Sequence, residues 1–429
     1  MSPRLVLRIS LLAAAAMAAP MSHAENTLVG FASLPAATFA KGPTSGQFAS
    51  SANGETLPLI DKQPVQGFSA VLPGPEAGTY YVMTDNGFGT KANSPDALLR
   101  IYALRPDFRR WNGRGIVGSG TVSPVDRTTG SWRPDFDGRS FLSLRDPDSK
   151  IGFPIVADRT YYPYSGSGPG SAEIPVADAI RKGHLLTGAD LDIESMRQDK
   201  NGNRWFGDEF GPFLVKTDAS GKLLRAAIPL PGVQSPDSPY LDGGTANLNR
   251  SAGYEGMAIN AAGDMLYPML EGTVSGDPVK SLRIYEFDVD SESYTGRHWL
   301  YALDASGTNI GDMTAVNDHQ FIVIERNGTQ EPRFKKLFLI DLAQVDEAGY
   351  AQKTELVDLM NLADPHDLNA DGSTLFTFPF VTIEDVLVLD SRTLLVMNDN
   401  NYPGSSKVEG VPDANEFLQI RLDQPLKPR

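Results

Sequence analysis

Carboxylates recur at two positions of a repeated pattern along the chain. In four segments a first acid is followed 13 to 16 residues later by a second. The pairs are Glu194 with Glu209, Glu255 with Glu271, Asp312 with Glu325, and Asp385 with Asp399. A fifth segment carries the later position as Asp85-Asn86. Carboxylates brought together raise one another's pKa unless a cation lies among them. With no Cys and few His, such an oxygen-rich set favours Ca²⁺ over Zn²⁺.

We therefore predict a calcium centre and leave the number of ions open. Its predicted ligands are Glu194, Asp208, Glu209, Glu255, Glu271, Glu325, Glu384, Asn398 and Asp399. At the fourth first-strand position, Asp385 is an alternative to Glu384. The competing interpretation is that these acids are solvated loop ends or cap backbone N–H groups in turns. Arg326 could bring a cation to an anionic substrate, or could pair with an acid of a neighbouring unit.

The elements that must position these acids are short strands joined by tight turns. Between the two acids of a pair lie turn signals such as Asn201-Gly202 and Gly263-Asp264, and each is followed by an apolar strand. A further strand follows the second acid in every segment, whereas helical periodicity is confined to Val176–Lys182 and Asp358–Leu362. The pattern predicts repeated antiparallel sheets.

Repeated sheets that cannot bury both faces alone are typical of a β-propeller, in which the innermost strands line a central channel. We predict an all-β chain forming a single β-propeller of six blades with loop insertions. Thr121–Pro175 is the candidate sixth unit, and Leu28–Ser33 is expected to pair with the C-terminal sheet and close the ring. A β-sandwich with appended loops is the rival architecture, but it gives no reason for acids to recur at one place in each unit.

Composition excludes several classes of function. The 429 residues carry 53 acidic and 38 basic side chains, a net charge of −15, which disfavours nucleic acid and anionic membrane surfaces as partners. The absence of Cys excludes disulfides, zinc ribbons and cysteine nucleophiles. The 41 Gly and 31 Pro indicate many turns and few long helices. We expect a monomer that acts on a small molecule and does not insert into a membrane.

The first 24 residues have the pattern of an export signal. Arg4 and Arg8 precede the apolar run Ile9–Ala19, and Ser22-His23-Ala24 has the small-x-small form of a cleavage site. We expect residues 1–24 to be a signal peptide and residues 25–429 to form the propeller domain. Without the two leader arginines the net charge becomes −17, from 36 basic and 53 acidic residues. The product should be periplasmic or secreted.

Other motifs carry less. Asp367-x-Asn369-x-Asp371-Gly372 matches the first half of an EF-hand loop, but Phe378 stands where a bidentate Glu is needed, so we favour an Asx-rich turn. Gly113-x-Gly115-x-x-Gly118 lacks the strand–helix context of a dinucleotide site. Ser195 is a conceivable nucleophile without an adjacent His, and the chain has no Gly-x-Ser-x-Gly elbow, Walker loop or His-Glu-x-x-His.

The repeated segments resemble the phytase-like family, exported bacterial proteins described as having esterase-like activity of the phytase type. The resemblance extends from about Gly30 to Leu422. The segments that carry it are Asp192-Ile193-Glu194-Ser195, Gly207-Asp208-Glu209-Phe210-Gly211-Pro212, Gly253-Tyr254-Glu255-Gly256-Met257, Glu325-Arg326-Asn327, Ile383-Glu384-Asp385 and Asn398-Asp399-Asn400-Asn401-Tyr402-Pro403.

This resemblance implies a propeller and calcium-assisted hydrolysis of phosphate esters. On this basis Glu209 and Glu255 are the predicted catalytic residues, and Arg326 and Asn86 are predicted to bind substrate. The chain lacks the Lys/Arg-rich set expected around a phytate site.

Two alternatives remain open. One is a propeller lactonase or carboxylesterase, resembling gluconolactonase, with one divalent ion on Glu194, Asn398 and Asp399. The other is a non-catalytic propeller that binds a partner in the cell envelope.

Overall fold

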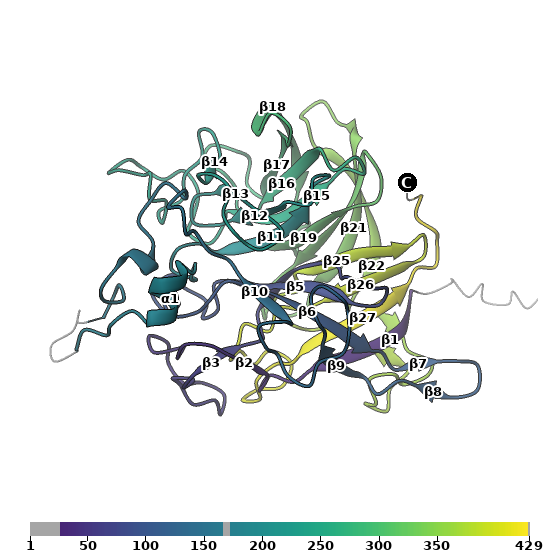
Figure 1. Cartoon of the computed structure of the whole chain (residues 1–429). Helices are drawn as coiled ribbons and strands as arrows, with labels where there is room; N and C mark the ends of the chain where they lie inside the picture. Colours follow the sequence, from purple (N-terminus) through teal and green to yellow (C-terminus); the bar gives the residue numbers. More distant parts are fainter. Residues whose placement is uncertain (1–25, 166–171, 428–429) are drawn as a thin grey trace, which may run out of the picture.

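The computed structural model describes residues 26–165 and 172–427, and strands dominate these residues (Figure 1). One α-helix, α1 (Asp178–Gly183), and one 3₁₀ turn, η1 (Val156–Asp158), occur in the described part of the chain. The predicted all-β class is confirmed. The predicted signal peptide lies outside the described residues. None of the described helices is long and apolar enough to span a bilayer.

Most strands belong to five antiparallel units of four strands each within residues 26–165 and 172–427. In order from the inner to the outer strand, the first unit has β4 (Phe68–Pro73), β5 (Tyr80–Thr84), β6 (Arg100–Asp107) and β9 (Thr121–Pro124); the second β11 (Ile193–Gln198), β12 (Arg204–Asp208), β13 (Phe213–Thr217) and β14 (Ile228–Pro229); the third β15 (Tyr254–Ile259), β16 (Met265–Leu270), β17 (Ser281–Asp288) and β18 (Ser293–Ala302); the fourth β19 (Asn309–Ala315), β20 (Gln320–Arg326), β21 (Lys335–Val345) and β22 (Ala351–Asp358); and the fifth β25 (Asp385–Asp390), β26 (Thr393–Met397), β27 (Asn415–Arg421) and β1 (Thr27–Leu34).

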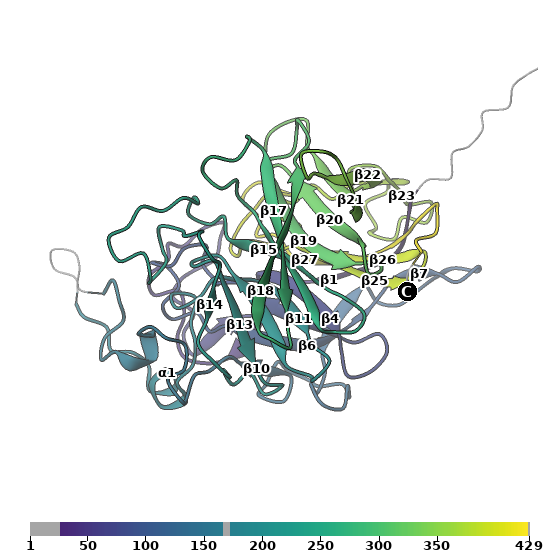
Figure 2. The same ribbon diagram turned by 90° about the horizontal axis from the view of Figure 1, so that it is seen from above.

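The first strands of these units form a ring. β4 packs against β11, β11 against β15, β15 against β19, β19 against β25, and β25 again against β4. Figure 2 shows the sheets arranged around these strands. Each unit is therefore a blade, and the described residues form a ring of five blades.

The blade count of six was wrong. Thr121–Pro175 does not build a separate blade, because its strands β9 and β10 (Phe141–Ser143) both pair with β6 of the first blade. The rest of this segment contributes η1 and loops, and it leads to α1 at the periphery (Figure 1). The sequence shows strands here, but only pairing reveals that they extend an existing sheet.

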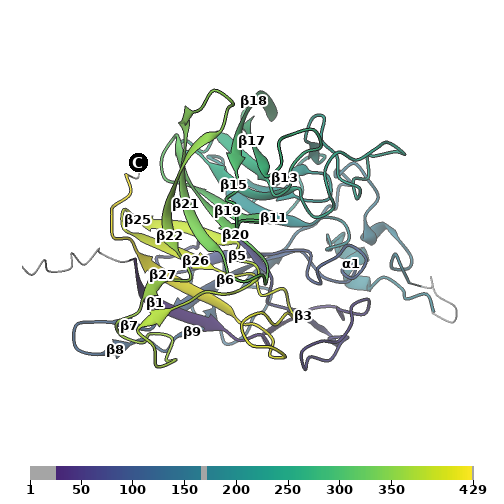
Figure 3. The ribbon, with the colours of Figure 1, turned by 180° about the vertical axis from the view of Figure 1, so that it is seen from behind.

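The N-terminal strand closes the ring, as predicted. β1 pairs antiparallel with β27 over seven residue pairs from Thr27↔Arg421 to Leu34↔Asn415. Figure 3 shows the purple β1 beside the yellow β27. This pairing covers the edge of β27, and the pair Ser33↔Thr121 links β1 to the first blade.

Apolar side chains fill the spaces between blades and fix their relative positions. Trp205 of the second blade meets Phe287 of the third at 5.2 Å between ring centroids, and Tyr267 of the third meets Phe321 of the fourth at 4.9 Å. Both Trp205 and Phe321 are fully buried. Such aromatic pairs each add about 0.5–1.5 kcal/mol beyond area burial, so the ring holds the inner strand ends in place.

Four short strands lie in connecting segments: β2 (Phe39–Lys41), which pairs with β3 (Lys62–Pro64), and β7 (Arg110–Trp111), which pairs with β8 (Ile116–Val117). β23 (Leu362–Ala363) pairs with β24 (Leu375–Phe376). The helix predicted over Asp358–Leu362 is not formed, because these residues end β22 and turn into β23. The helix predicted over Val176–Lys182 corresponds to α1.

Candidate functional site

A β-bulge near the start of the inner strand turns one side chain toward the ring axis in several blades. In β11 the register shifts between Ile193 and Ser195, which leaves Glu194 as the extra residue. The same shift leaves Glu255 unpaired in β15 and Ser69 unpaired in β4. A bulge re-aims a side chain away from the sheet alternation. The repeated first acid is thus a repeated bulge.

The second repeated position lies at the end of the next strand in each blade. Asp208, Glu325 and Thr84 pair with the residue just before the bulge of their own blade. The residue that follows each of them therefore sits beside the bulge. These following residues, together with the equivalents in the third and fifth blades, are Asp85, Glu209, Glu271, Arg326 and Asp399.

Both sets of side chains line one cavity of about 160 Å³, which we call the acidic cavity. Its carboxylates number eight: Asp85, Asp192, Glu194, Glu209, Glu255, Glu271, Glu384 and Asp399. Asn86, Gly89, Ser251, Arg326 and Asn401 complete the lining. The predicted convergence of Glu194, Glu255 and Glu384 is confirmed, and Arg326 is the one basic residue among the described residues that line the cavity.

Glu209 stands at the centre of the carboxylate cluster. Asp192, Glu194 and Glu209 each offer an oxygen within 4.8 Å of the others, and so do Glu209, Glu255 and Glu271. Oε1 of Glu209 is buried and has no hydrogen-bond partner. A buried acceptor without a partner is costly, so this atom is a position where a cation or a proton donor fits.

Arg326 offsets part of this negative charge. Its Nη2 donates to Oε1 of Glu255 at 3.1 Å, of Glu271 at 3.3 Å and of Glu384 at 3.0 Å. The fourth blade has Gly311 at the bulge, where a Cβ would meet the Ile383 carbonyl oxygen at 2.0 Å. This blade therefore contributes a cation and no carboxylate to the cavity.

Burial and mutual repulsion raise the carboxyl pKa values. Burial, then the Asp192 carboxylate, raises the pKa of Glu194 well above its usual range; for Glu209 the causes are burial and then Glu271. Burial and Glu384 raise the pKa of Asp399 to about 8. Burial raises the pKa of Glu271 to about 7 although Arg326 opposes the shift. For Arg326, burial lowers the pKa, but the three glutamates outweigh it and the net shift is upward. The cavity without a cation is therefore under electrostatic strain.

Two of the cavity acids were not among the predicted ligands. Asp85 and Asp192 lie in the repeated segments, but the spacing rule applied only to the acids that follow or precede a fixed interval. Asp192 comes two residues before the bulge, and its Oδ1 accepts from Nδ2 of Asn86 at 2.7 Å. Asn86, predicted to bind substrate, also accepts from the Gly89 amide at 2.9 Å, so it braces Asp192 within the cavity.

Three predicted ligands lie outside the acidic cavity, and each is one residue too early in the chain. Asp208 accepts from the backbone N–H of Asp192 and of Gly211, both at 2.8 Å. Asn398 accepts from the Glu416 amide at 2.8 Å and donates to the Ala414 carbonyl at 3.1 Å. These side chains brace strand ends instead of facing the axis.

Glu325 is the third displaced ligand. It accepts from the Tyr301 hydroxyl and from the Asp304 amide, and it pairs with Lys353. Successive side chains of a strand point to opposite faces, so Arg326 faces the cavity and Glu325 faces the outer part of its own blade. The alternative metal set of Glu194, Asn398 and Asp399 is likewise not assembled, because Asn398 is turned away.

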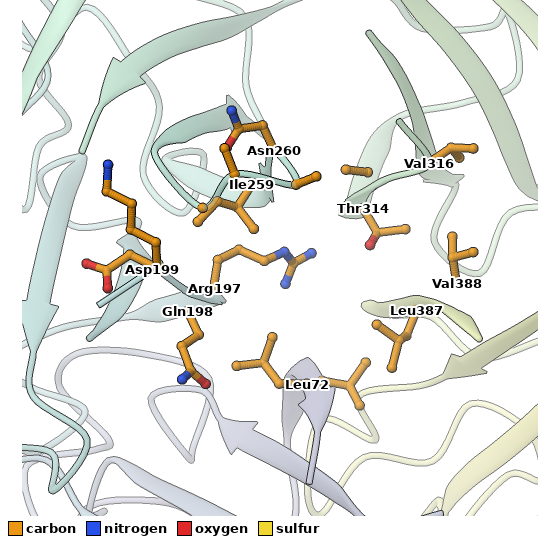
Figure 4. A pocket seen from close by; sticks show the side chains of 16 residues that line it. Leu72, Arg197, Gln198, Asp199, Ile259, Asn260, Thr314, Val316, Leu387 and Val388 are labelled. Atoms are coloured by element: carbon orange, nitrogen blue, oxygen red, sulfur yellow. The ribbon is translucent and has the colours of Figure 1, made fainter. Parts of the chain in front are cut away.

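The opposite end of the ring has a different character. The far ends of the inner strands line a second cavity of about 670 Å³, into which Arg197 of β11 extends (Figure 4). Nη2 of Arg197 donates to Oδ1 of Asp312 at 2.7 Å and to Oδ2 at 2.9 Å. Asp312 therefore does not join the acidic cavity. Asp385 is fully buried, and neither of its carboxylate oxygens has a hydrogen-bond partner.

The incomplete EF-hand segment is an exposed turn, as favoured. Oδ1 of Asp367 accepts from the Gly372 amide at 3.0 Å, and Oδ1 of Asp371 accepts from the Ser373 amide at 2.8 Å. These side chains stabilise the turn locally. Ser195 is fully buried and its hydroxyl has no partner in the described structure, which gives no support to the nucleophile interpretation.

The residues of the acidic cavity fit a hard divalent cation. The donor set is all oxygen, the unpartnered Oε1 of Glu209 belongs to both carboxylate groups, and Arg326 pairs with Glu255, Glu271 and Glu384 but leaves Asp192, Glu194 and Glu209 uncompensated. Oxygen ligands on a partly flexible site suit Ca²⁺. The best-fitting position is among the three uncompensated acids.

The family model described as "Phytase-like: Esterase-like activity of phytase" matches residues 63–402. This range contains every residue that lines the acidic cavity. An uncharacterized secreted protein of Arthroderma benhamiae is 25% identical over 259 residues, which are 49% of this chain and 50% of the relative. The alignment thus spans about half the length of that relative.

Solved structures with a similar arrangement are distant in sequence. A periplasmic gluconolactonase of Pseudomonas aeruginosa is 14% identical with a TM-score of 0.35, covering 94% of this chain and 98% of its own. A luciferin-regenerating enzyme is 10% identical with a TM-score of 0.36, covering 94% of both chains. A GH43 β-1,3-galactosidase is 12% identical with a TM-score of 0.43, covering 88% of this chain and 63% of its own.

Proposed function

The chain belongs to the phytase-like family, and from this premise we propose that it is an exported, calcium-dependent hydrolase of phosphate esters. One observation carries the proposal: eight carboxylates line a single small cavity with one arginine, and Oε1 of the central Glu209 has no partner. Such a cavity repels an anionic substrate unless a cation is bound. Export is supported by the leader pattern of residues 1–24 and by the description of the relative as secreted.

Asp192, Glu194 and Glu209 would hold the Ca²⁺ ion, whose charge would draw phosphoryl oxygens into the cavity and stabilise the charge that develops on them. Asp192 is oriented by the amide of Asn86. Glu194 projects from the β11 bulge. Two inner-strand features of one blade thus place the proposed ligands before any ion binds.

Glu209 is the proposed general base. Its Oε1 is free to accept the proton of an attacking water, and its raised pKa makes the carboxylate a better proton acceptor near neutral pH. Glu255 is the second proposed catalytic carboxylate, and Arg326 holds it in place. Arg326 itself spans three glutamates, so its main effect is to position them and to lower the negative charge that a substrate meets.

An assay panel tests the proposal. Phosphate monoesters and diesters, lactones and acyl esters would be offered to the purified chain with Ca²⁺ and with excess chelator. We expect calcium-dependent release of phosphate. Turnover of lactones or acyl esters alone would overturn the phosphate assignment, and an inactive chain that still binds Ca²⁺ would favour the non-catalytic propeller.

A further inference from the structure

A second cavity adjoins the acidic cavity and has a different lining. It measures about 320 Å³ and shares Asp85, Gly89 and Asn401 with the acidic cavity. Its other lining residues are Ala49, Ser50, Ala52, Asn53, Gly87, Phe88, Asn93, Tyr402, Pro403 and Gly404. We call it the side pocket. Since the two cavities share three residues, a molecule bound in one can extend into the other.

The apolar side of the side pocket is rigid. Phe88 and Tyr402 are 7% and 4% exposed, and they belong to one buried cluster with Leu59 and Ala97. The rings therefore offer an apolar surface that is already ordered before a ligand arrives. Preformed pockets of this kind lose little free energy on ligand ordering.

The walls come from two loops that are tied to each other. Nδ2 of Asn53 donates to the Pro403 carbonyl at 2.6 Å, which joins the loop at residues 49–53 to the loop at residues 401–404. Oδ1 of Asp399 accepts from the Asn401 amide at 2.7 Å, so the second loop is also fixed to the acidic cavity. The pocket and the proposed reaction site are thus held in one relative position.

Charge in the side pocket is confined to the shared edge. Among the described residues that line it, Asp85 is the one ionisable acid, and Lys, Arg and His are absent. Amide side chains come from Asn53, Asn93 and Asn401, and a hydroxyl comes from Ser50. Amides both donate and accept hydrogen bonds, which suits hydroxyl groups, whereas a phosphate here would face Asp85 without a counter-charge.

We propose that the side pocket binds the alcohol portion of the substrate and that this portion is an uncharged, hydroxylated group of about monosaccharide size. This inference rests on the proposed function, because it assigns the esterified oxygen to the acidic cavity. The volume lies at the small end of the range for small-molecule pockets. The substrate class is therefore a monophosphate of a neutral polyol, and a polyol carrying several phosphates is disfavoured.

A pocket-filling variant tests the assignment. Ala52 lines the side pocket and is exposed, so Ala52→Trp narrows the pocket without disturbing the buried cluster. Ala348→Trp is the matched control, because Ala348 is exposed in the turn between β21 and β22 and lines none of these cavities. The measurement is kcat/KM for glucitol monophosphate divided by kcat/KM for methyl phosphate.

We expect this ratio to fall about tenfold or more in Ala52→Trp, through a higher KM for the polyol ester, and to stay within twofold in Ala348→Trp. In the starting protein the monophosphate should exceed inositol hexakisphosphate as a substrate. An unchanged ratio in Ala52→Trp, or equal turnover of the hexakisphosphate, would overturn the inference while leaving phosphate ester hydrolysis standing.

A binding experiment separates this inference from the proposed function. The probe is myo-inositol alone, titrated into the calcium-loaded chain and followed by ligand-observed NMR. Binding that Ala52→Trp weakens and Ala348→Trp does not supports the side pocket even if no ester is hydrolysed. Binding that is equal in both variants would overturn it.

Discussion

Nη2 of Arg326 lies 3.1 Å from Oε1 of Glu255, and this contact joins the end of β20 in the fourth blade to the bulge of β15 in the third. Both side chains are almost fully buried, with 8% and 5% of their surface exposed. The same guanidinium reaches Glu271 and Glu384. One cation therefore links three of the five blades across the ring axis.

Arg326→Met should destabilise the calcium-free chain strongly. Removing one partner of a buried ion pair costs about 3–5 kcal/mol, because the remaining charges stay buried without compensation. Urea unfolding in excess chelator measures the loss. Added Ca²⁺ should raise the free energy of unfolding more in this variant than in the starting chain, since three glutamates become free to bind it.

Arg333→Met is the matched control. Arg333 pairs with Glu331, which is 74% exposed, and exposed pairs contribute about 0–1 kcal/mol. If both variants lost the same stability, the buried network around Arg326 would not be the feature that holds the blades together.

The register of the strands explains why the sequence located the cavity but not all of its members. Spacing of 13 to 16 residues between acids correctly indicates a hairpin that brings two acids to one end of a blade. It does not decide which of two adjacent polar residues faces the axis. Asp208-Glu209 and Glu325-Arg326 illustrate this, since the first residue of each pair braces its own blade. The bulge that turns Glu194 inward depends on pairing across the sheet, which spacing along the chain does not record.

The number of blades has a similar explanation. β10 resembles the strand of an additional unit when its residues are considered alone, but in the structure it pairs with β6 of the first blade. Its partner is set by tertiary contacts rather than by local propensity. The pairing of β1 with β27 was predictable because a ring of sheets needs its last edge covered.

Chelation should lower the melting temperature of the calcium-loaded chain by several degrees. A ligand that binds only the native state adds about 2.7 kcal/mol at 100 times its Kd, and about 1 kcal/mol corresponds to a shift of a few degrees or less in a chain of this length. Differential scanning calorimetry with Ca²⁺ and with excess chelator gives the comparison. Identical melting curves, together with metal analysis that finds no calcium, would contradict the proposed centre.

Without calcium, stability should fall as the pH rises from about 4.5 to about 8. The folded-state pKa of Glu271 is about 7 and that of Asp399 is about 8, against ordinary values of 4.5 and 3.8. In this interval the native state binds more protons than the unfolded state, so the contribution is complete below the ordinary pKa and is lost as the pH passes the folded pKa. Urea unfolding in chelator at pH 5 and pH 8 measures it.

The same experiment with saturating Ca²⁺ is the control. A bound cation favours the ionised carboxylates, so the decline between pH 5 and pH 8 should become smaller or reverse. A chelated chain that is more stable at pH 8 than at pH 5 would show that repulsion in the acidic cavity is not a leading cost.

Glu209→Gln and Glu325→Gln should separate a cavity ligand from an acid of similar sequence context. Each substitution keeps the side-chain volume and removes one charge. Glu209→Gln should weaken Ca²⁺ binding and reduce any hydrolytic rate on the order of 100-fold or more, since it changes the central carboxylate of the acidic cavity. Glu325→Gln should retain Ca²⁺ affinity but lower the free energy of unfolding by about 1–3 kcal/mol, because its charged partner Lys353 is left behind.

Asp371→Asn completes this series, because Asp371 lies in an exposed turn that asparagine also favours. Isothermal titration with Ca²⁺, urea unfolding and initial rates on the best phosphate ester would be measured on all three variants. The structure orders them: Glu209→Gln loses metal and rate, Glu325→Gln loses stability, and Asp371→Asn loses neither. Equal loss of Ca²⁺ affinity in Glu209→Gln and Glu325→Gln would show that the second residue of each strand-end pair is not the one that faces the ion, and equal rates in all three variants would make the acidic cavity a structural feature rather than a reaction site.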